Sequence, residues 1–195
     1  MSVNQLEILV SPKPSVKAAT LADLYRVPEH GKAEIVNGKL IIMPLTGFFP
    51  VRAAGEIYAS LREYERRTHS GYAITDNAGF VVNLPNRNSF SPDAAFYTGK
   101  VTGMKFLEGA PVFAVDVRSE NDYGLQAERE MTQKRADYFA AGTLIVWDVD
   151  LQSDDVVRVY RASDPAHPTI YKQKDVAEAE PALPGWTMRV ADLFR

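Results

Sequence analysis

The sequence predicts an α/β fold in a single domain, and three observations support this prediction. The chain has 195 residues and 46% hydrophobic content, enough for one ordinary globular core. Helical and strand-like patterns alternate in the order helix, strands, helix, strands. Asn37-Gly38 stands between two apolar runs and predicts an N-terminal β-hairpin. We expect an N-terminal arm over residues 1–18 and one domain over residues 19–195.

The composition excludes several classes of protein. A net charge of -3 gives no broad basic field, so any contact with nucleic acid has to be local. The chain has no cysteine, which excludes disulfides, thiolate metal sites and a cysteine nucleophile. No apolar run approaches the roughly 18 residues of a membrane span. We therefore expect a cytoplasmic protein with no membrane partner.

Capping and turn signals predict the first elements. "TLADLYRVPEHG" predicts a short helix with Thr20 as N-cap and Asp23 in the capping-box position, ending before Pro28. "AEIVNGKLIIM" predicts the hairpin, because a type I′ turn needs positive φ at both central residues. Pro50 predicts the start of a long helix that continues to residue 68. Its core-facing stripe is expected to comprise Val51, Ala54, Tyr58, Leu61 and Tyr64 or Glu65.

The rest of the chain predicts two groups of strands around a second helix. Strands are expected over residues 72–84, 90–97 and 112–119, followed by a helix over residues 125–141. Gly142 ends this helix because the C′ position favours a residue without Cβ. Further strands are expected over residues 143–150, 156–161 and 169–174. Trp147 and Trp186 are expected to pack in the core or at its edge.

Two aspartates lie in strands that are otherwise built to be buried. They are Asp93 in "SPDAAF" and Asp116 in "FAVDVRS". Because alternate residues of a strand share a face, neighbouring strands would bring both carboxylates to one end of a shared face. Such a pair repels unless a cation lies between them, and carboxylate oxygens suit Mg²⁺ or Mn²⁺. Alternatively, Asp93 satisfies backbone amides at a strand start, and Asp116 forms an ion pair with Arg118 or Arg135.

A lysine occurs in the mostly apolar row of the second helix. The row follows spacings of four, three, four and three, and comprises Ala127, Met131, Lys134, Tyr138 and Ala141. Lys134 either extends from this row to solvent or directs its ammonium group at the two carboxylates.

Five blocks of the sequence together resemble a known family. They are "AEIVNGKLIIMP", "SPDAAF", "FAVDVRS", "KRADYFAAGTLIVWDVD" and "PALPGWTMRVADLF". In this order they resemble the Uma-two family, restriction endonucleases of the PD-(D/E)XK nuclease superfamily, from Glu34 to Phe194. The resemblance implies a restriction-endonuclease-like core, with a mixed β-sheet flanked by helices. It also implies Mg²⁺-dependent or Mn²⁺-dependent hydrolysis of nucleic-acid phosphodiesters, with DNA as the expected partner.

The resemblance also implies roles for individual residues. By position, Asp93 matches the motif aspartate, Asp116 the second acidic ligand and Lys134 the catalytic lysine. Glu34 matches an early glutamate, which would be either a further acid at the metal or a structural acid. Cutting both strands of a duplex usually needs two active sites, so a homodimer is expected.

Three positions depart from the family pattern. Asp116 stands where family members typically have glutamate, and Pro50 stands near the place of a frequent histidine. Arg118 stands where an orthodox D-x-K would place its lysine, and a permanently protonated arginine is a poor general base. The first two departures favour an alternative function, a catalytically degenerate module that serves as a binding or assembly partner.

Overall fold

The computed structural model describes residues 18–27 and 31–195, so the predicted arm before residue 18 and the predicted helix stop at Pro28 lie outside the described residues. The elements, in chain order, are α1 (Leu21–Leu24), β1 (Lys32–Val36), β2 (Lys39–Met43), α2 (Phe48–Thr68), β3 (Tyr72–Thr75), β4 (Phe80–Val81), β5 (Ser89–Phe90), β6 (Ala94–Tyr97), β7 (Leu107–Glu108), β8 (Phe113–Val117), α3 (Leu125–Ala140), β9 (Ile145–Val149), β10 (Val157–Arg161), β11 (Asp164–Tyr171), β12 (Val176–Glu178), β13 (Thr187–Arg189) and the 3-10 helix η1 (Val190–Phe194).

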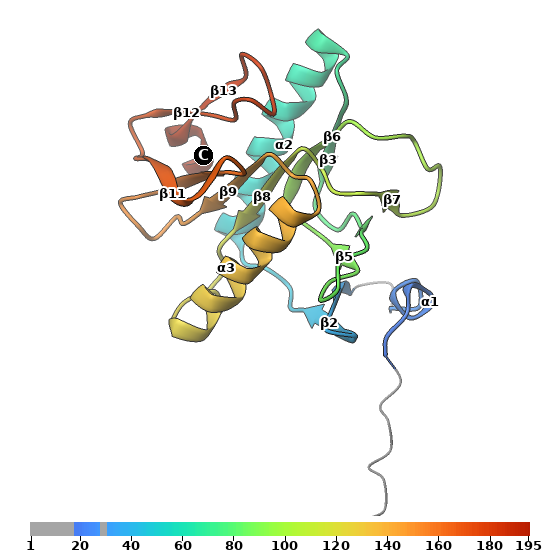
Figure 1. The fold of residues 1–195 in the computed structure, drawn as a ribbon. Helices are drawn as coiled ribbons and strands as arrows, with labels where there is room; N and C mark the ends of the chain where they lie inside the picture. Colours follow the sequence, from blue (N-terminus) through green and yellow to red (C-terminus); the bar gives the residue numbers. More distant parts are fainter. Residues whose placement is uncertain (1–17, 28–30) are drawn as a thin grey trace, which may run out of the picture.

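A six-stranded mixed sheet forms the centre of the molecule (Figure 1). Its strand order is β11-β10-β9-β8-β6-β3. β8 and β9 run parallel, whereas the other neighbouring pairs are antiparallel. Parallel neighbours require a crossover connection, and α3 supplies it between β8 and β9. The predicted α/β fold with a mixed sheet and an N-terminal hairpin is therefore confirmed.

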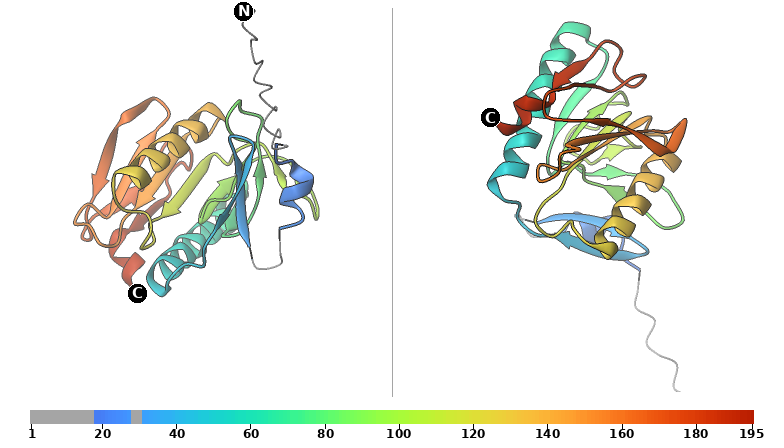
Figure 2. Two further views of the ribbon diagram at one scale, coloured as in Figure 1. Left: turned by 90° about the horizontal axis from the view of Figure 1, so that it is seen from below. Right: turned by 90° about the vertical axis from the view of Figure 1, so that its left-hand side faces the viewer.

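The two long helices cover opposite faces of this sheet (Figure 2). On one face, α2 buries Ile57 and Leu61 in the same apolar cluster as Phe113. On the other face, Tyr138 of α3 stacks on Phe90 with ring centroids 4.1 Å apart. Residues 113, 115 and 117 of β8 belong to the α2 cluster and residue 114 to the α3 cluster, as strand alternation requires. The sheet thus separates two apolar cores.

The helix α2 begins earlier than its sequence predicts. It starts at Phe48, so Pro50 occupies the first turn, where its missing N–H is not needed. The N-cap residue, Gly47, has no side chain that could form a capping hydrogen bond, so the sequence contains no capping signal at this helix start. The prediction that Val51 faces the core is wrong, because it is 50% exposed, and Ile57 is fully buried instead. Within the described residues, no helix is both long and apolar enough to cross a membrane.

Local signals at the two ends of the domain behave as expected. Thr20 and Asp23 form both hydrogen bonds of a capping box. Asn37 and Gly38 have φ of 50° and 68°, as the hairpin turn requires. In the C-terminal segment, Trp186 packs its ring 5.1 Å from that of Trp147, and both indoles are buried in the α2 cluster.

The strand β11 forms one edge of the sheet. It begins five residues before the predicted strand at residue 169 and includes Pro165 and Pro168. Its pairing with β10 shifts register between Val159 and Arg161. Proline cannot donate a ladder hydrogen bond, and such residues are typical of edge strands and bulges.

Candidate active site

Asp93 and Asp116 lie side by side at one end of the strand pair β6–β8. These strands are antiparallel neighbours, and the N–H of Asp93, the residue just before β6, donates to the Val115 carbonyl at 2.9 Å. The Asp93 carboxylate turns toward β8, where its Oδ2 accepts a hydrogen bond of 2.7 Å from the Val117 N–H. This bond agrees with the backbone-satisfying interpretation of Asp93. It also fixes the carboxylate next to Asp116.

Lys134 reaches this pair from α3. Its Nζ lies 2.9 Å from Oδ1 of Asp116 and 3.2 Å from Oε1 of Glu34. The ammonium group also lies 5.7 Å from the centre of the Tyr138 ring, one turn along the helix. Only 18% of the lysine side chain is exposed. Of the two interpretations of Lys134, the structure therefore has the ammonium directed at the carboxylates rather than extended into solvent.

Glu34 is held on both of its oxygens. Oε1 accepts from the Ser91 N–H at 2.9 Å, and Oε2 forms a short ion pair with Nη1 of Arg87. Arg87 also donates through Nε to the buried Asp137 of α3 at 2.8 Å. Glu34 thereby links the hairpin to Lys134 and to the segment before β5. Its part in metal binding stays a prediction.

A second lysine, which the sequence analysis did not identify, lies on Asp93. Nζ of Lys32 is 2.6 Å from Oδ1 of Asp93 and 2.7 Å from Oδ1 of Asp76. Lys32 and Glu34 stand two residues apart in β1, so they share a face of the hairpin. Because Glu34 was predicted at the site, the alternation of β1 also places Lys32 on the side of the site. This alternation was the signal in the sequence from which Lys32 could have been identified.

The charges of this cluster shift several protonation equilibria. Burial raises the pKa of Asp116, and the charge of Asp93 adds to this rise, while Lys134 partly opposes it. Burial would raise the pKa of Glu34, but Lys134 and Arg87 together hold it below its ordinary value. Burial would lower the pKa of Lys134, but Asp116 and Glu34 raise it well above its ordinary value. Lys134 is therefore a cation at neutral pH, and the pKa of Asp116 is raised whereas that of Glu34 is lowered.

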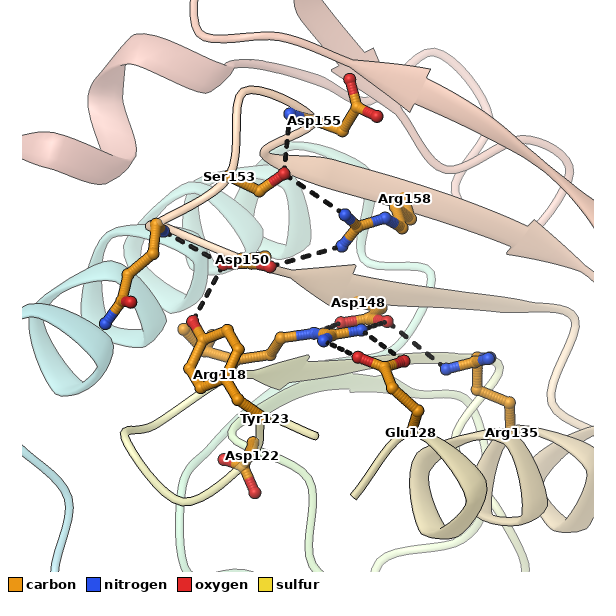
Figure 3. A network of polar contacts seen from close by, with 12 residues as sticks. Arg118, Asp122, Tyr123, Glu128, Arg135, Asp148, Asp150, Ser153, Asp155 and Arg158 are labelled. Atoms are coloured by element: carbon orange, nitrogen blue, oxygen red, sulfur yellow. Dashed lines mark hydrogen bonds and ion pairs between the residues drawn. The ribbon is translucent and has the colours of Figure 1, made fainter. Parts of the chain in front are cut away.

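The alternative that Asp116 pairs with an arginine is wrong. Arg118 binds Asp148 through two hydrogen bonds of 2.8 Å and also forms a short ion pair with Glu128 (Figure 3). Arg135 approaches the same carboxylate of Asp148 at 3.4 Å. Asp148 stands beside Asp116 in the parallel register of β8 and β9. Because Asp148 attracts both arginines, Asp116 interacts with Lys134 alone among these cations.

Comparison with known proteins identifies the family. The family model Uma2, described as "Putative restriction endonuclease", matches residues 19–191. The chain belongs to the Uma2 family. A crystal structure described as a "putative nuclease belonging to DUF820" from Anabaena variabilis has a TM-score of 0.71 and 17% sequence identity. That match covers 90% of this chain and 97% of the other, and it shows a shared fold. No curated protein sequence matches the chain.

The donor set in this Uma2 chain fits a hard divalent cation bound by few protein ligands. In the described parts of the chain, no group of three or more His, Cys, Asp or Glu residues could hold a metal ion. Mg²⁺, however, usually binds through one or two carboxylates and retains water or takes substrate phosphate oxygens. Asp93 and Asp116 are two such oxygen donors, and after burial the charge of Asp93 contributes to the raised pKa of Asp116. The pair fits Mg²⁺ or Mn²⁺, but not a site built from protein ligands alone.

Proposed function

We propose that this protein is a metal-dependent endonuclease that hydrolyses phosphodiester bonds of nucleic acid, with DNA as substrate. The observation that carries the proposal is the convergence of two carboxylates and one lysine, from the residue before β6, from β8 and from α3. Asp93 accepts the N–H of Val117, the neighbour of Asp116, and Lys134 lies 2.9 Å from Asp116. Membership of a family described as restriction endonucleases supports the same reaction class. We further propose that the protein acts in the cytoplasm, where DNA is accessible.

In this proposal each residue has a distinct task. Asp93 and Asp116 would hold Mg²⁺ or Mn²⁺, with Glu34 as a further acid nearby. The bound ion would polarise the scissile phosphate and lower the pKa of a water molecule. Lys134 is charged at neutral pH, so it serves as a hydrogen-bond donor to developing negative charge rather than as a general base. Glu34 also positions Lys134, through the contact of 3.2 Å.

A cleavage assay tests the proposal. Purified full-length protein is incubated with plasmid DNA in the presence of Mg²⁺ or Mn²⁺. We expect metal-dependent nicking or cutting that Asp93→Asn abolishes. The matched control is Asp154→Asn, which removes an equal charge from an exposed loop residue and should leave the rate unchanged. Equal rates in the parent and in Asp93→Asn would contradict the proposal.

Two observations favour the alternative of a catalytically degenerate module. Asp116 is one methylene shorter than the glutamate of the family pattern, and Lys32 already lies 2.6 Å from Asp93. In such a module DNA or a protein partner would bind without turnover. DNA binding by gel shift, together with no cleavage under any divalent ion, would support this second function.

We also propose a homodimer, because two active sites are needed to cut both strands of a duplex. Sedimentation equilibrium of the full-length protein tests this. A monomer at the concentrations at which duplex cleavage occurs would contradict it.

A further inference from the structure

The environment of Lys32 differs from that of an ordinary surface lysine. Its side chain is only 17% exposed, and its Nζ lies between two carboxylates, 2.6 Å from Asp93 and 2.7 Å from Asp76. The two partners come from different segments, one after β3 and the other before β6. Lys32 itself belongs to the hairpin, so a single ammonium group joins three parts of the chain.

Both oxygens of Asp93 are already engaged. Oδ2 accepts the Val117 N–H at 2.7 Å, and Oδ1 accepts Nζ of Lys32. Each oxygen has a second lone pair, but a divalent cation on Asp93 would be repelled by the ammonium group already bound to Oδ1, so metal binding favours displacement of the lysine over its retention; the alternative is to displace the backbone hydrogen bond of the sheet. Replacing the lysine is the easier of the two, because its ammonium group keeps a carboxylate partner in Asp76. The Asp76 side chain is 36% exposed, so water can complete the solvation of the displaced ammonium group.

We propose that Lys32 is a built-in counter-ion that occupies the cation position of Asp93 and moves onto Asp76 when a divalent metal ion binds. This inference rests on the proposed metal-dependent function of Asp93 and deepens it. Lys32 keeps the carboxylate neutralised in the metal-free protein, and it lowers the affinity for metal because the ion pair must first be broken. Asp76 is the carboxylate that receives the displaced lysine.

Binding of Mn²⁺ alone to the full-length protein tests this without any turnover. The affinity is measured by isothermal titration or by the electron paramagnetic resonance signal of free Mn²⁺. Lys32→Met removes the competing cation and should tighten Mn²⁺ binding by about tenfold or more. The matched control is Lys39→Met, which removes the same charge from an exposed position of the same hairpin and should leave the affinity nearly unchanged.

Asp76→Asn separates displacement from simple charge repulsion. This variant leaves the displaced lysine without a carboxylate partner, so Mn²⁺ binding should weaken. Asp76→Asn removes a negative charge that attracts Mn²⁺, and this effect is the same with or without Lys32. It also removes the carboxylate that accepts the displaced lysine, and this effect exists only where Lys32 is present. The weakening should therefore be several times larger in the parent than alongside Lys32→Met, by the reasoning of a double-mutant cycle. Equal weakening in the two backgrounds would overturn the proposed movement.

The outcomes also distinguish this inference from the proposed function. If the parent binds Mn²⁺ and Asp93→Asn abolishes binding, but Lys32→Met binds no tighter, only the counter-ion role of Lys32 is overturned. If the parent and every variant, including Lys32→Met, bind no Mn²⁺, both the inference and the metal-dependent function are overturned. Asp76→Asn alone keeps the inference testable if Lys32→Met does not fold, because unchanged Mn²⁺ affinity in Asp76→Asn would contradict it.

Discussion

Lys134→Met tests whether the cation between Asp116 and Glu34 supports the fold as well as the site. Methionine keeps the helix propensity and most of the apolar stem but removes the charge. At 2.9 Å and an effective dielectric constant of about 20, Coulomb's law gives about 6 kcal/mol of attraction to Asp116. The desolvation of the ammonium group offsets several kcal/mol of this attraction. We expect the free energy of unfolding at pH 7 to fall by about 3 kcal/mol, the lower end for removing one partner of a buried pair, because a quarter of the Asp116 side chain is exposed.

The loss should depend on pH in a defined direction. Burial and Asp93 already raise the pKa of Asp116 above 3.8, and removing Lys134 raises it further. When the folded-state pKa of a carboxyl group is raised, the free energy of unfolding of the protein falls as the pH rises from the unfolded-state pKa through the folded-state pKa. The destabilisation by Lys134→Met should therefore be larger at pH 7 than in acid and shrink as the pH falls through the folded-state pKa of Asp116. The remainder should disappear only when Glu34, whose pKa Lys134 holds below its ordinary value, is also protonated.

Urea denaturation followed by the fluorescence of the two buried tryptophans provides the assay. Lys39→Met, at an exposed position of the hairpin, is the control for loss of one positive charge. The double variant with Asp116→Asn should lose less than Lys134→Met alone, since no uncompensated carboxylate remains at position 116. A loss below about half a kcal/mol at pH 7, as for a solvated lysine, would refute the reasoning. So would a loss that is the same at every pH.

Three further substitutions test other parts of the structure. Asp116→Glu should tighten Mn²⁺ binding, measured by titration, and raise the cleavage rate, measured with plasmid DNA; a loss of about 1–3 kcal/mol in unfolding free energy with no gain in affinity would indicate overpacking instead. Arg87→Met should lower the unfolding free energy by about 3–5 kcal/mol, because it leaves Asp137 buried without its arginine, and a thermal melt that equals the parent's would contradict this. Arg118→Met should also destabilise the protein in a urea titration but leave Mn²⁺ affinity unchanged, because Arg118 binds Asp148 (Figure 3); a large change in affinity would place Arg118 in the site after all.

The sequence predicted those features of the fold that depend on only a few adjacent residues. The Asn37-Gly38 turn and the capping box each depend on the conformation of adjacent residues, so the sequence shows them directly. Strand alternation correctly predicts that residues 113, 115 and 117 face away from residue 114. The start of α2 was missed because Gly47 supplies no capping side chain, and Val51 is exposed in the first turn, with Phe48 and Phe49 also exposed.

The ion pairs between residues far apart in the sequence could not be predicted. Lys32 and Asp93 are 61 residues apart, and no local pattern states which carboxylate a lysine will contact. The alternative pairing of Asp116 with Arg118 or Arg135 failed for the same reason. A strand neighbour, Asp148, attracts the arginine through two hydrogen bonds, and this geometry exists only once β8 and β9 are adjacent.

The edge strand β11 constrains how two copies of the protein could assemble. An exposed edge normally offers a row of N–H groups on which a second chain can add a strand. Pro165 and Pro168 have no N–H to donate, and the register shift opposite them disturbs the regular spacing of the strand's hydrogen-bonding groups. Continuation of the sheet from one copy into another through β11 is therefore disfavoured. A homodimer would have to associate through another surface or through the opposite edge of the sheet, β3, and the prolines of β11 also disfavour open-ended strand addition at this edge.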